Sequence, residues 1–201
     1  TRVNQRIGSD IRKEIARSFD GIYVIIDPAH TNNRPPIDIA KAVLSGGAIA
    51  IQLRDKLSEP QLILDTAYEL NDLCRNMGAL FIMNDFVDLG TIVDSDGVHL
   101  GKHDIHIKDA RKIMNPSQMI GTSNAFIQEA LDSESEGSDY LAIGSVFPTT
   151  TKEQTRESNL NEISQLKTTT DIPIIAIGGI NSSNVSQVAQ SGADAACIIS
   201  A

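Results

Sequence analysis

Two kinds of charged residue in the sequence could together hold a metal ion and a diphosphate. Asp85 and Asp104 lie after short apolar runs. Carboxylates are the protein ligands that Mg²⁺ usually accepts, with water and substrate phosphates in its other positions. Arg54, Lys56 and Lys152 lie after other apolar runs and would offset the charge of a diphosphate. This set predicts a magnesium site at Asp85 and Asp104, beside a cationic site for a diphosphate.

A second anion site is indicated by Gly178-Gly179. The pair follows the apolar run Ile174–Ile177 and precedes a stretch of helical period that begins at Ser182. Glycine lets a backbone approach a ligand closely, and N–H groups at the start of a helix favour a negative charge. Two anion sites suggest two phosphorylated substrates.

The elements that must position these residues are short β-branched runs, which alternate with longer stretches of helical period. Strands are predicted at Gly21–Ile26, Ile49–Leu53, Leu80–Met83, Gly97–Leu100, Met119–Thr122, Tyr140–Ile143, Ile174–Ile177 and Ala195–Ile199. Helices are predicted at Ile37–Leu44, Pro60–Met77, Phe86–Val93, Ile107–Met114, Ile127–Glu134, Asn159–Lys167 and Ser182–Gln190. Asp96 and Asp139, each directly before a predicted strand, are interpreted only as turn residues.

Eight strands with helices between them are typical of parallel βαβ units, and eight such units can close into a (β/α)8 TIM barrel of the α/β class. Related helix-to-strand junctions recur at Ser45–Ala48, Ser135–Asp139 and Ser191–Asp194. This repetition favours the barrel over an open doubly wound sheet. In a barrel, the carboxyl ends of the strands face the active site, and the loops after strands seven and eight commonly bind phosphate.

The first residues are expected to form an extra helix outside the barrel. Residues 1–19 carry a helical period at Ile7, Ile11 and Ile15. The sequence therefore predicts a single barrel domain over residues 1–201, with an extra N-terminal helix and with the eighth barrel helix not covered.

Each candidate group also has a purely structural explanation. Asp85 and Asp88 fit the cap and first turn of a helix, and the cations at 54–56 fit a solvated charge cluster. The Lys-Glu pair at 152–153 fits a surface ion pair, and the glycines at 178–179 fit a tight turn with no ligand.

The composition argues against several kinds of partner. With 17 basic and 26 acidic residues the formal net charge is −9, which disfavours nucleic acid and anionic membrane surfaces. No apolar run reaches the roughly 18 residues that span a bilayer. Cys74 and Cys197 lack metal-ligand spacing and are predicted to be core thiols of a reducing compartment, the cytoplasm. Zinc is disfavoured, because His99, His103 and His106 share no fixed helical register.

Five short segments share their order and residue types with one enzyme family. They are Gln52–Lys56, Asn84–Leu89, Asp96–Asp104, Gly144–Lys152 and Ala176–Ile180. Together, from Tyr23 to Ser200, the chain resembles thiamine-phosphate synthases. The resemblance implies an eight-stranded α/β barrel that joins hydroxymethylpyrimidine diphosphate to thiazole phosphate and releases pyrophosphate. It also implies a dissociative mechanism assisted by Mg²⁺.

The resemblance also implies a role for each matching residue. The pyrimidine diphosphate would be held by Gln52, Arg54, Lys56, Asn84, Ser123 and Lys152. Of these, Arg54, Ser123 and Lys152 would act in catalysis. Magnesium would be bound by Asp85 and Asp104, as the residue types alone suggest. The thiazole phosphate would be held by Thr149, Thr151, Gly179 and the backbone at Ile199 and Ser200.

The sequence departs from the family pattern at three places, of which Ala125-Phe126 would lie near the pyrimidine and the other two at the rim. Members commonly carry His-Thr where Ala125-Phe126 stand, Gln where Lys102 stands, and Gly-Leu where Asn159-Leu160 stand. Two alternatives remain open. One is a related thiazole tautomerase, which needs no metal and uses a histidine base. The presence of Asp85, Asp104 and Lys152 and the lack of a histidine at position 125 argue against it. The other is a phosphate-binding barrel that regulates a partner without catalysis.

Overall fold

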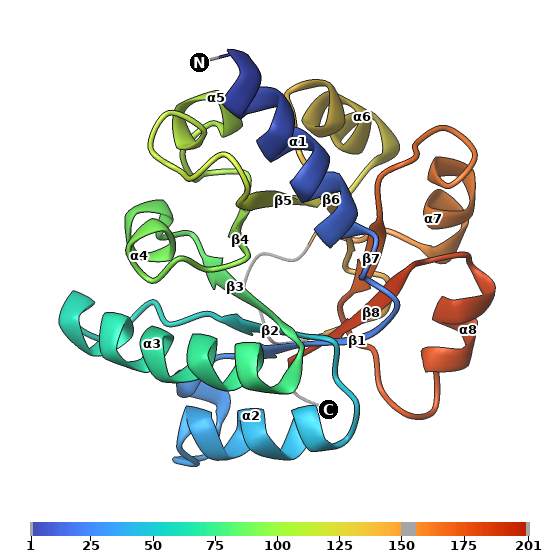
Figure 1. The fold of residues 1–201 in the computed structure, drawn as a ribbon. Coiled ribbons are helices and arrows are strands. Elements are labelled where there is room, and N and C mark those ends of the chain that lie inside the picture. The colour runs from blue at the N-terminus through green and yellow to red at the C-terminus, as the bar shows by residue number, and fades with distance from the viewer. Residues whose placement is uncertain (1, 150–155, 200–201) are drawn as a thin grey trace.

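Eight parallel strands close into a barrel in the computed structural model, which describes residues 2–149 and 156–199 (Figure 1). The strands are β1 (Gly21–Ile26), β2 (Ala50–Leu53), β3 (Leu80–Asn84), β4 (Gly97–Leu100), β5 (Met119–Asn124), β6 (Tyr140–Gly144), β7 (Ile174–Ile177) and β8 (Ala195–Ile198). Each pairs in parallel with the next, and β8 pairs with β1. The predicted α/β barrel is confirmed.

The helices lie around the outside of the barrel (Figure 1). They are α1 (Arg2–Ala16), α2 (Pro36–Ser45), α3 (Pro60–Met77), α4 (Val87–Ile92), α5 (Ile107–Ala110), α6 (Ile127–Ser135), α7 (Leu160–Leu166) and α8 (Val185–Gln190), with a short 3-10 helix η1 (Pro28–His30). None of these described helices is long and apolar enough to cross a membrane.

Two helices are shorter than predicted, for local reasons. Helix α5 ends at Ala110. A turn follows in which the Asn115 N–H donates a hydrogen bond to Gln118 Oε1 at 3.0 Å. Before α8, the Asn181 N–H donates to Asn184 Oδ1 at 2.8 Å. This side-chain turn delays the helix to Val185, because it satisfies the backbone in a non-helical form.

The strands alternate between two cores, as their period of two requires. Inward residues such as Tyr23, Ile82 and Ile175 fill the barrel, and the outward residues pack under the surrounding helices. Phe19, just before β1, closes the amino end of the barrel, with its ring 4.7 Å from that of Tyr140. Cys74 and Cys197 are buried in these cores, as predicted.

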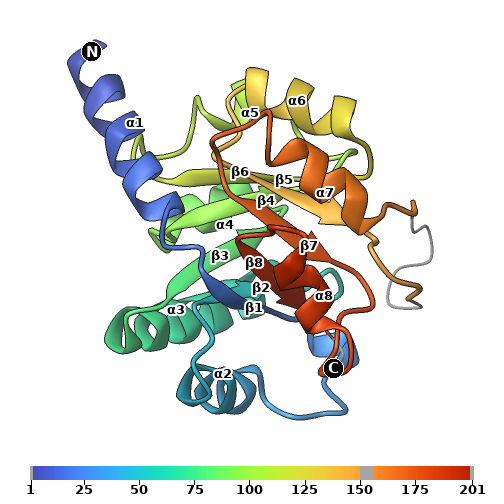
Figure 2. The ribbon, with the colours of Figure 1, turned by 90° about the vertical axis from the view of Figure 1, so that its right-hand side faces the viewer.

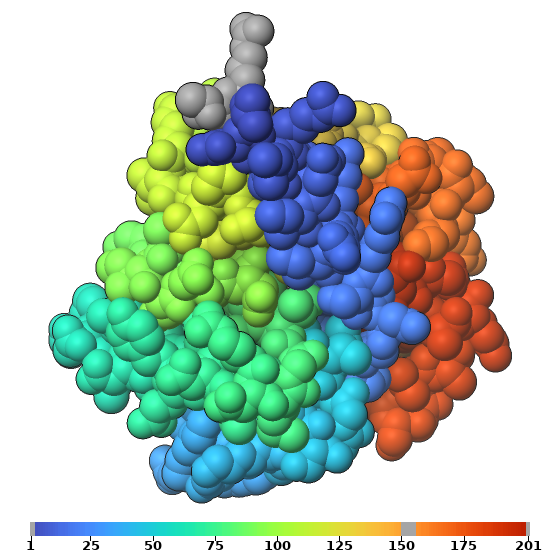
Figure 3. All heavy atoms as spheres, viewed as in Figure 1, coloured from blue at the N-terminus to red at the C-terminus, as the bar shows by residue number. Residues whose placement is uncertain are grey.

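Helix α1 lies at the amino end of the barrel, opposite the carboxyl ends of the strands (Figure 2), and covers part of that face (Figure 3). The face that it turns to the barrel differs from the prediction, since Ile7 is 54% and Ile11 is 40% exposed. Gly8 is buried instead, where an added Cβ would lie 2.4 Å from Pro116 O. This close backbone approach and a polar contact of Arg12 orient the helix.

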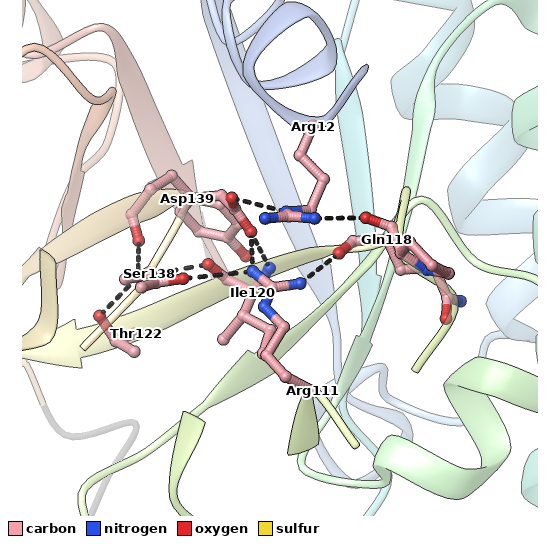
Figure 4. A network of polar contacts seen from close by, with 10 residues as sticks. Arg12, Arg111, Gln118, Ile120, Thr122, Ser138 and Asp139 are labelled. Atoms are coloured by element: carbon pink, nitrogen blue, oxygen red, sulfur yellow. Dashed lines mark hydrogen bonds and ion pairs between the residues drawn. The ribbon is translucent and has the colours of Figure 1, made fainter. Parts of the chain in front are cut away.

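Asp139 is the centre of that polar contact, so its interpretation as a turn residue alone is wrong (Figure 4). Its carboxylate accepts hydrogen bonds from Arg12 Nε at 2.9 Å, from the Ile120 N–H at 2.8 Å and from Arg111. Asp96 has a comparable role, since it accepts from the Phe81 N–H at 2.8 Å. Both aspartates begin one strand and tie it to its neighbour.

Asp139→Ala is expected to lower the free energy of unfolding by about 3–5 kcal/mol, because it leaves two guanidinium groups without their shared carboxylate. Arg12→Ala should cost roughly 1 kcal/mol, since Asp139 then keeps Arg111 and the Ile120 N–H. Urea unfolding of both variants measures the difference. Equal costs would show that Asp139 acts only as the partner of Arg12.

Candidate active site

The predicted site residues meet at the carboxyl ends of the strands. Those within the described part of the chain are Gln52, Arg54, Lys56, Asn84, Asp85, Asp104, Ser123, Thr149, Gly179 and Ile199. Thr151, Lys152 and Ser200 lie outside the described residues. Each described residue is one of the last two of a strand or stands in the loop that follows one, at the active-site face of a parallel barrel.

Asp85 and Asp104 form a carboxylate pair. Their carboxyl groups lie close enough to shift each other's pKa, although they come from the loops after β3 and β4. Burial and the contact with Asp85 raise the pKa of Asp104. Burial also opposes ionisation of Asp85, but hydrogen bonds from Lys56 and Asp104 outweigh it and hold the pKa of Asp85 below its usual value. The pair therefore holds one proton more readily than two isolated carboxylates would.

The backbone of Asp85 shows that it is not a helix cap. Its φ is 61°, in the left-handed region, and its N–H donates to His99 O at 2.9 Å. Helix α4 begins at Val87 with Phe86 at its N-cap and no capping side chain. The left-handed turn thus directs Asp85 to Asp104 and not to the helix.

This donor set fits Mg²⁺. Two adjacent carboxylates repel each other unless a proton or a cation lies between them, and Mg²⁺ needs only one or two protein oxygens when phosphate and water complete its shell. A cluster of three or more His, Cys, Asp or Glu side chains that could hold a metal ion does not occur among the described residues. Asp85 and Asp104 are the residues that would hold the metal.

Asp104→Asn is expected to stabilise the metal-free protein at neutral pH. Because the pKa of Asp104 is higher in the folded state than in the unfolded state, protonated Asp104 favours folding at low pH. This contribution to stability is lost as the pH rises through the pKa of the folded state. At pH 7 the charged group therefore disfavours the fold, and Asn relieves the repulsion while still accepting from Gly101 N–H. Calorimetry in EDTA should show a rise in Tm of about 2–4 °C. The rise should vanish below about pH 4, where wild-type Asp104 is protonated in either state. A fall in Tm at pH 7 would contradict this reasoning.

The two described cations are held by carboxylates. Lys56 Nζ lies 2.8 Å from Asp85 Oδ2, and Arg54 Nη1 donates to Asp27. Asp27 is 4% exposed and also accepts from the Ala29 N–H at 3.1 Å. Each cation therefore has its own carboxylate partner. Lys56, with a half-exposed side chain, lies beside the acidic pair, whereas Arg54 lies beside Asp27.

Asp27 is a site residue that the sequence reasoning missed. It directly follows the apolar run of β1, so the rule that selected Asp85 after β3 would also have selected it. Glu129 on α6 was missed as well. It accepts from the Ala125 N–H at 3.0 Å, from Lys102 Nζ at 3.3 Å and from Arg156.

Glu129 interacts with two of the positions at which the sequence departs from the family pattern, Lys102 and Ala125. Burial disfavours the charged form, but hydrogen bonds from Ala125 N–H and Arg156 hold the pKa of Glu129 below its usual value. Arg156 also lies over the Phe126 ring, 6.0 Å from its centroid. Glu129 thus links Lys102, Ala125 and Arg156, and Arg156 covers one side of Phe126.

The remaining residues of the pyrimidine set lie inside the barrel. Ser123 Oγ is 2.8 Å from His99 Nε2. Gln52 Oε1 and Asn84 Nδ2 are buried and have no hydrogen-bond partner in the described part of the chain. Buried polar atoms are rarely left unpaired, so this acceptor and this donor are suited to a bound ligand.

The second group lies at the ends of β6, β7 and β8. Gly179 has φ 65°, and an added Cβ would lie 2.5 Å from Pro148 O and 2.8 Å from Phe147 Cβ. The glycine is therefore required by packing against the loop after β6, where Thr149 stands. The expectation that Gly179 opens a helix is wrong, because α8 begins at Val185.

A cavity extends beside this second group. It has a volume of about 850 Å³, and its lining includes Asn181 and Ser182 after β7, Ile199 after β8 and Asp27 after β1. The loop hydroxyls and amides of this region are suited to a phosphate. Ile199 and Asn181 line the cavity together, whereas Gly179 and Thr149 are not among its lining residues.

Parallel closure of eight strands, with functional polar groups at their carboxyl ends, defines a (β/α)8-barrel enzyme. The model of the thiamine monophosphate synthase family matches residues 22–201. The chain belongs to this family.

Individual relatives agree with this assignment. A thiamine-phosphate synthase of Pyrococcus furiosus is 40% identical over 180 residues, which are 90% of this chain and 85% of that protein. One of Shouchella clausii is 36% identical over 179 residues, or 89% of this chain and 86% of that protein. The solved structure of thiamine phosphate pyrophosphorylase from Pyrococcus furiosus matches with a TM-score of 0.84 and 37% identity, covering 92% of this chain and 88% of that one.

Proposed function

We propose that the chain joins 4-amino-2-methyl-5-hydroxymethylpyrimidine diphosphate to 4-methyl-5-(2-phosphoethyl)thiazole, giving thiamine phosphate and pyrophosphate. Family membership supports the overall reaction. The observation that carries the proposal for this chain is the Asp85–Asp104 pair with Lys56 bound to one of its members. A carboxylate pair beside fixed cations is suited to a metal-bound diphosphate and has no evident use for a substrate without one.

The reaction proceeds in two bond changes. The C–O bond between the pyrimidine methylene and the diphosphate breaks first, and its electron pair leaves with the pyrophosphate. The lone pair of the thiazole nitrogen then captures the methylene cation and forms the new C–N bond. The product ring carries the positive charge, so no base has to remove a proton.

The residues of the mouth act mainly on the leaving group. Arg54, Lys56 and Lys152 stabilise the negative charge that grows on the pyrophosphate oxygens. Magnesium, when bound by Asp85 and Asp104, supplies further charge stabilisation at the same oxygens.

Other residues hold the two rings and the second phosphate. Gln52, Asn84 and Ser123 bind the pyrimidine by hydrogen bonds. Thr149, Thr151, Gly179 and the backbone at Ile199 and Ser200 bind the thiazole phosphate. The contact of Gly179 with Phe147 and Pro148 supports this grouping, because it brings the loops after β6 and β7 together.

Calorimetric titration tests the two-site arrangement. The pyrimidine diphosphate should bind with Mg²⁺ and lose most of its affinity in EDTA, whereas the thiazole phosphate should bind in either buffer. The pyrimidine diphosphate should still bind when inorganic phosphate occupies the thiazole phosphate site, and the thiazole phosphate should still bind when inorganic pyrophosphate occupies the diphosphate site. Binding of the thiazole phosphate alone would favour a tautomerase, and tight binding of both without turnover would favour a regulatory barrel.

A further inference from the structure

A continuous hydrogen-bonded chain crosses the interior of the barrel below the mouth. Gln52 Nε2 donates to the Tyr23 hydroxyl at 2.6 Å, and the Tyr23 and Tyr140 hydroxyls are 3.4 Å apart. The Tyr140 hydroxyl is 3.1 Å from His99 Nδ1, and His99 Nε2 is 2.8 Å from Ser123 Oγ. The two ends of the chain, Gln52 and Ser123, are both assigned to the pyrimidine, whereas the three residues between them have no role in the reaction described above.

The middle of the chain is sealed from solvent. Tyr23 is 1% and Tyr140 is 0% exposed, and His99 is 6% exposed. Gly121 makes room for the Tyr140 ring, since an added Cβ there would lie 1.9 Å from its Cζ. Burial raises the pKa of both tyrosines, so each hydroxyl keeps its single proton at neutral pH.

A chain of single-proton hydroxyls has a direction. Because Gln52 Nε2 donates to Tyr23, the Tyr23 proton is directed to Tyr140. The Tyr140 proton is directed in turn to His99 Nδ1, which leaves the proton of a neutral imidazole on Nε2. His99 Nε2–H then donates to Ser123 Oγ, and the Ser123 proton remains available to a ligand. Reversal would require every proton in the chain to change partner together.

We propose that Tyr23, Tyr140 and His99 are positioning residues that hold the Ser123 hydroxyl as a hydrogen-bond donor to an acceptor nitrogen of the substrate ring. The proposal rests on the proposed function for the identity of that ring. A ring that presents N–H at this point would meet a second donor and be rejected. Ring specificity is thus set in the barrel core as well as at the mouth.

The tautomer of His99 tests the proposal without any substrate. In ¹⁵N-histidine-labelled protein at neutral pH, the His99 side chain is expected as the neutral Nε2–H tautomer, with Nδ1 at the shift of an acceptor nitrogen. Tyr140→Phe removes the donor to Nδ1 at nearly constant volume and should produce a mixture of the two tautomers. A neutral Nδ1–H form or a doubly protonated ring in the wild type would overturn the proposal, as would an unchanged tautomer in the variant.

Binding measurements then separate positioning from general damage to the fold. Tyr140→Phe and Tyr23→Phe should each weaken the pyrimidine diphosphate about tenfold, the factor that corresponds to one lost hydrogen bond. The affinity for inorganic pyrophosphate with Mg²⁺ should not change, because that ligand has no ring. Tyr68→Phe, on the 44% exposed Tyr68 of α3, is the matched control and should alter neither affinity.

A double-mutant cycle identifies the route of the effect. In a Ser123→Ala background, Tyr140→Phe should have no further effect on pyrimidine binding, since Ser123 is the group through which the chain acts. Additive losses, or equal weakening of pyrophosphate, would show that Tyr140 supports the barrel only. If the proposed reaction failed while the His99 tautomer and this coupling remained, the chain would be retained and only the identity of the ring would change.

Discussion

Asp85→Asn is expected to lower kcat/KM by about 10³-fold or more at saturating Mg²⁺, with the fold intact. The change removes one of two carboxylates that would hold the metal, and it also removes the ion pair with Lys56. Steady-state kinetics over a range of Mg²⁺ concentrations provide the measurement. Excess metal should restore little of the activity, because the lost charge also positions Lys56.

Asp88→Asn is the matched control for this variant. Asp88 follows Asp85 by three positions, is exposed on the first turn of α4, and is not part of the acidic pair. Its variant should retain wild-type activity. Near-normal turnover of Asp85→Asn, or of the wild type in EDTA, would remove the metal assignment.

Arg54→Ala is expected to lower the rate of the chemical step by about 10²–10³-fold, the usual cost of losing one donor aimed at developing charge. Single-turnover kinetics separate this step from binding. The affinity for the pyrimidine diphosphate should change much less, because the charge on the leaving group is greatest in the transition state. A loss confined to KM would show instead that Arg54 binds ground state and transition state equally.

The control for Arg54 must account for its buried partner. Arg54→Ala leaves Asp27 without its guanidinium, so part of any loss could come from an unpaired carboxylate. Arg54→Ala/Asp27→Asn removes that unpaired charge and should remain as slow as the single variant. Recovery of the chemical step in the double variant would assign the defect to Asp27. Arg6→Ala, at an exposed position of α1, should leave the rate unchanged.

The sequence was sufficient to predict the barrel and the acidic pair. Alternating runs such as Gly21–Ile26 and Ile174–Ile177 mark the strands, and parallel neighbours must end at the same face. That rule alone brings Asp85 and Asp104 together. The rule does not predict where each side chain points. For Asp85 that direction depends on a left-handed backbone conformation, which an aspartate at this place in the sequence need not adopt.

Interactions between distant segments were not predictable in the same way. Asp139 has the sequence context of a turn residue, and its partners Arg12 and Arg111 come from elements far away in the chain. The tyrosines have the sequence context of ordinary core residues, because an inward position fits an apolar ring as well as a hydroxyl. Only the closed barrel brings Tyr23 and Tyr140, from β1 and β6, within reach of each other.

The reaction itself provides the most direct measurement. The purified chain is incubated with the pyrimidine diphosphate, the thiazole phosphate and Mg²⁺, and pyrophosphate and thiamine phosphate are followed together. We predict one pyrophosphate for each thiamine phosphate, and neither product when one substrate or the metal is omitted. Loss of pyrophosphate from the pyrimidine substrate with no thiamine phosphate formed, or no reaction with all three present, would contradict the proposed function.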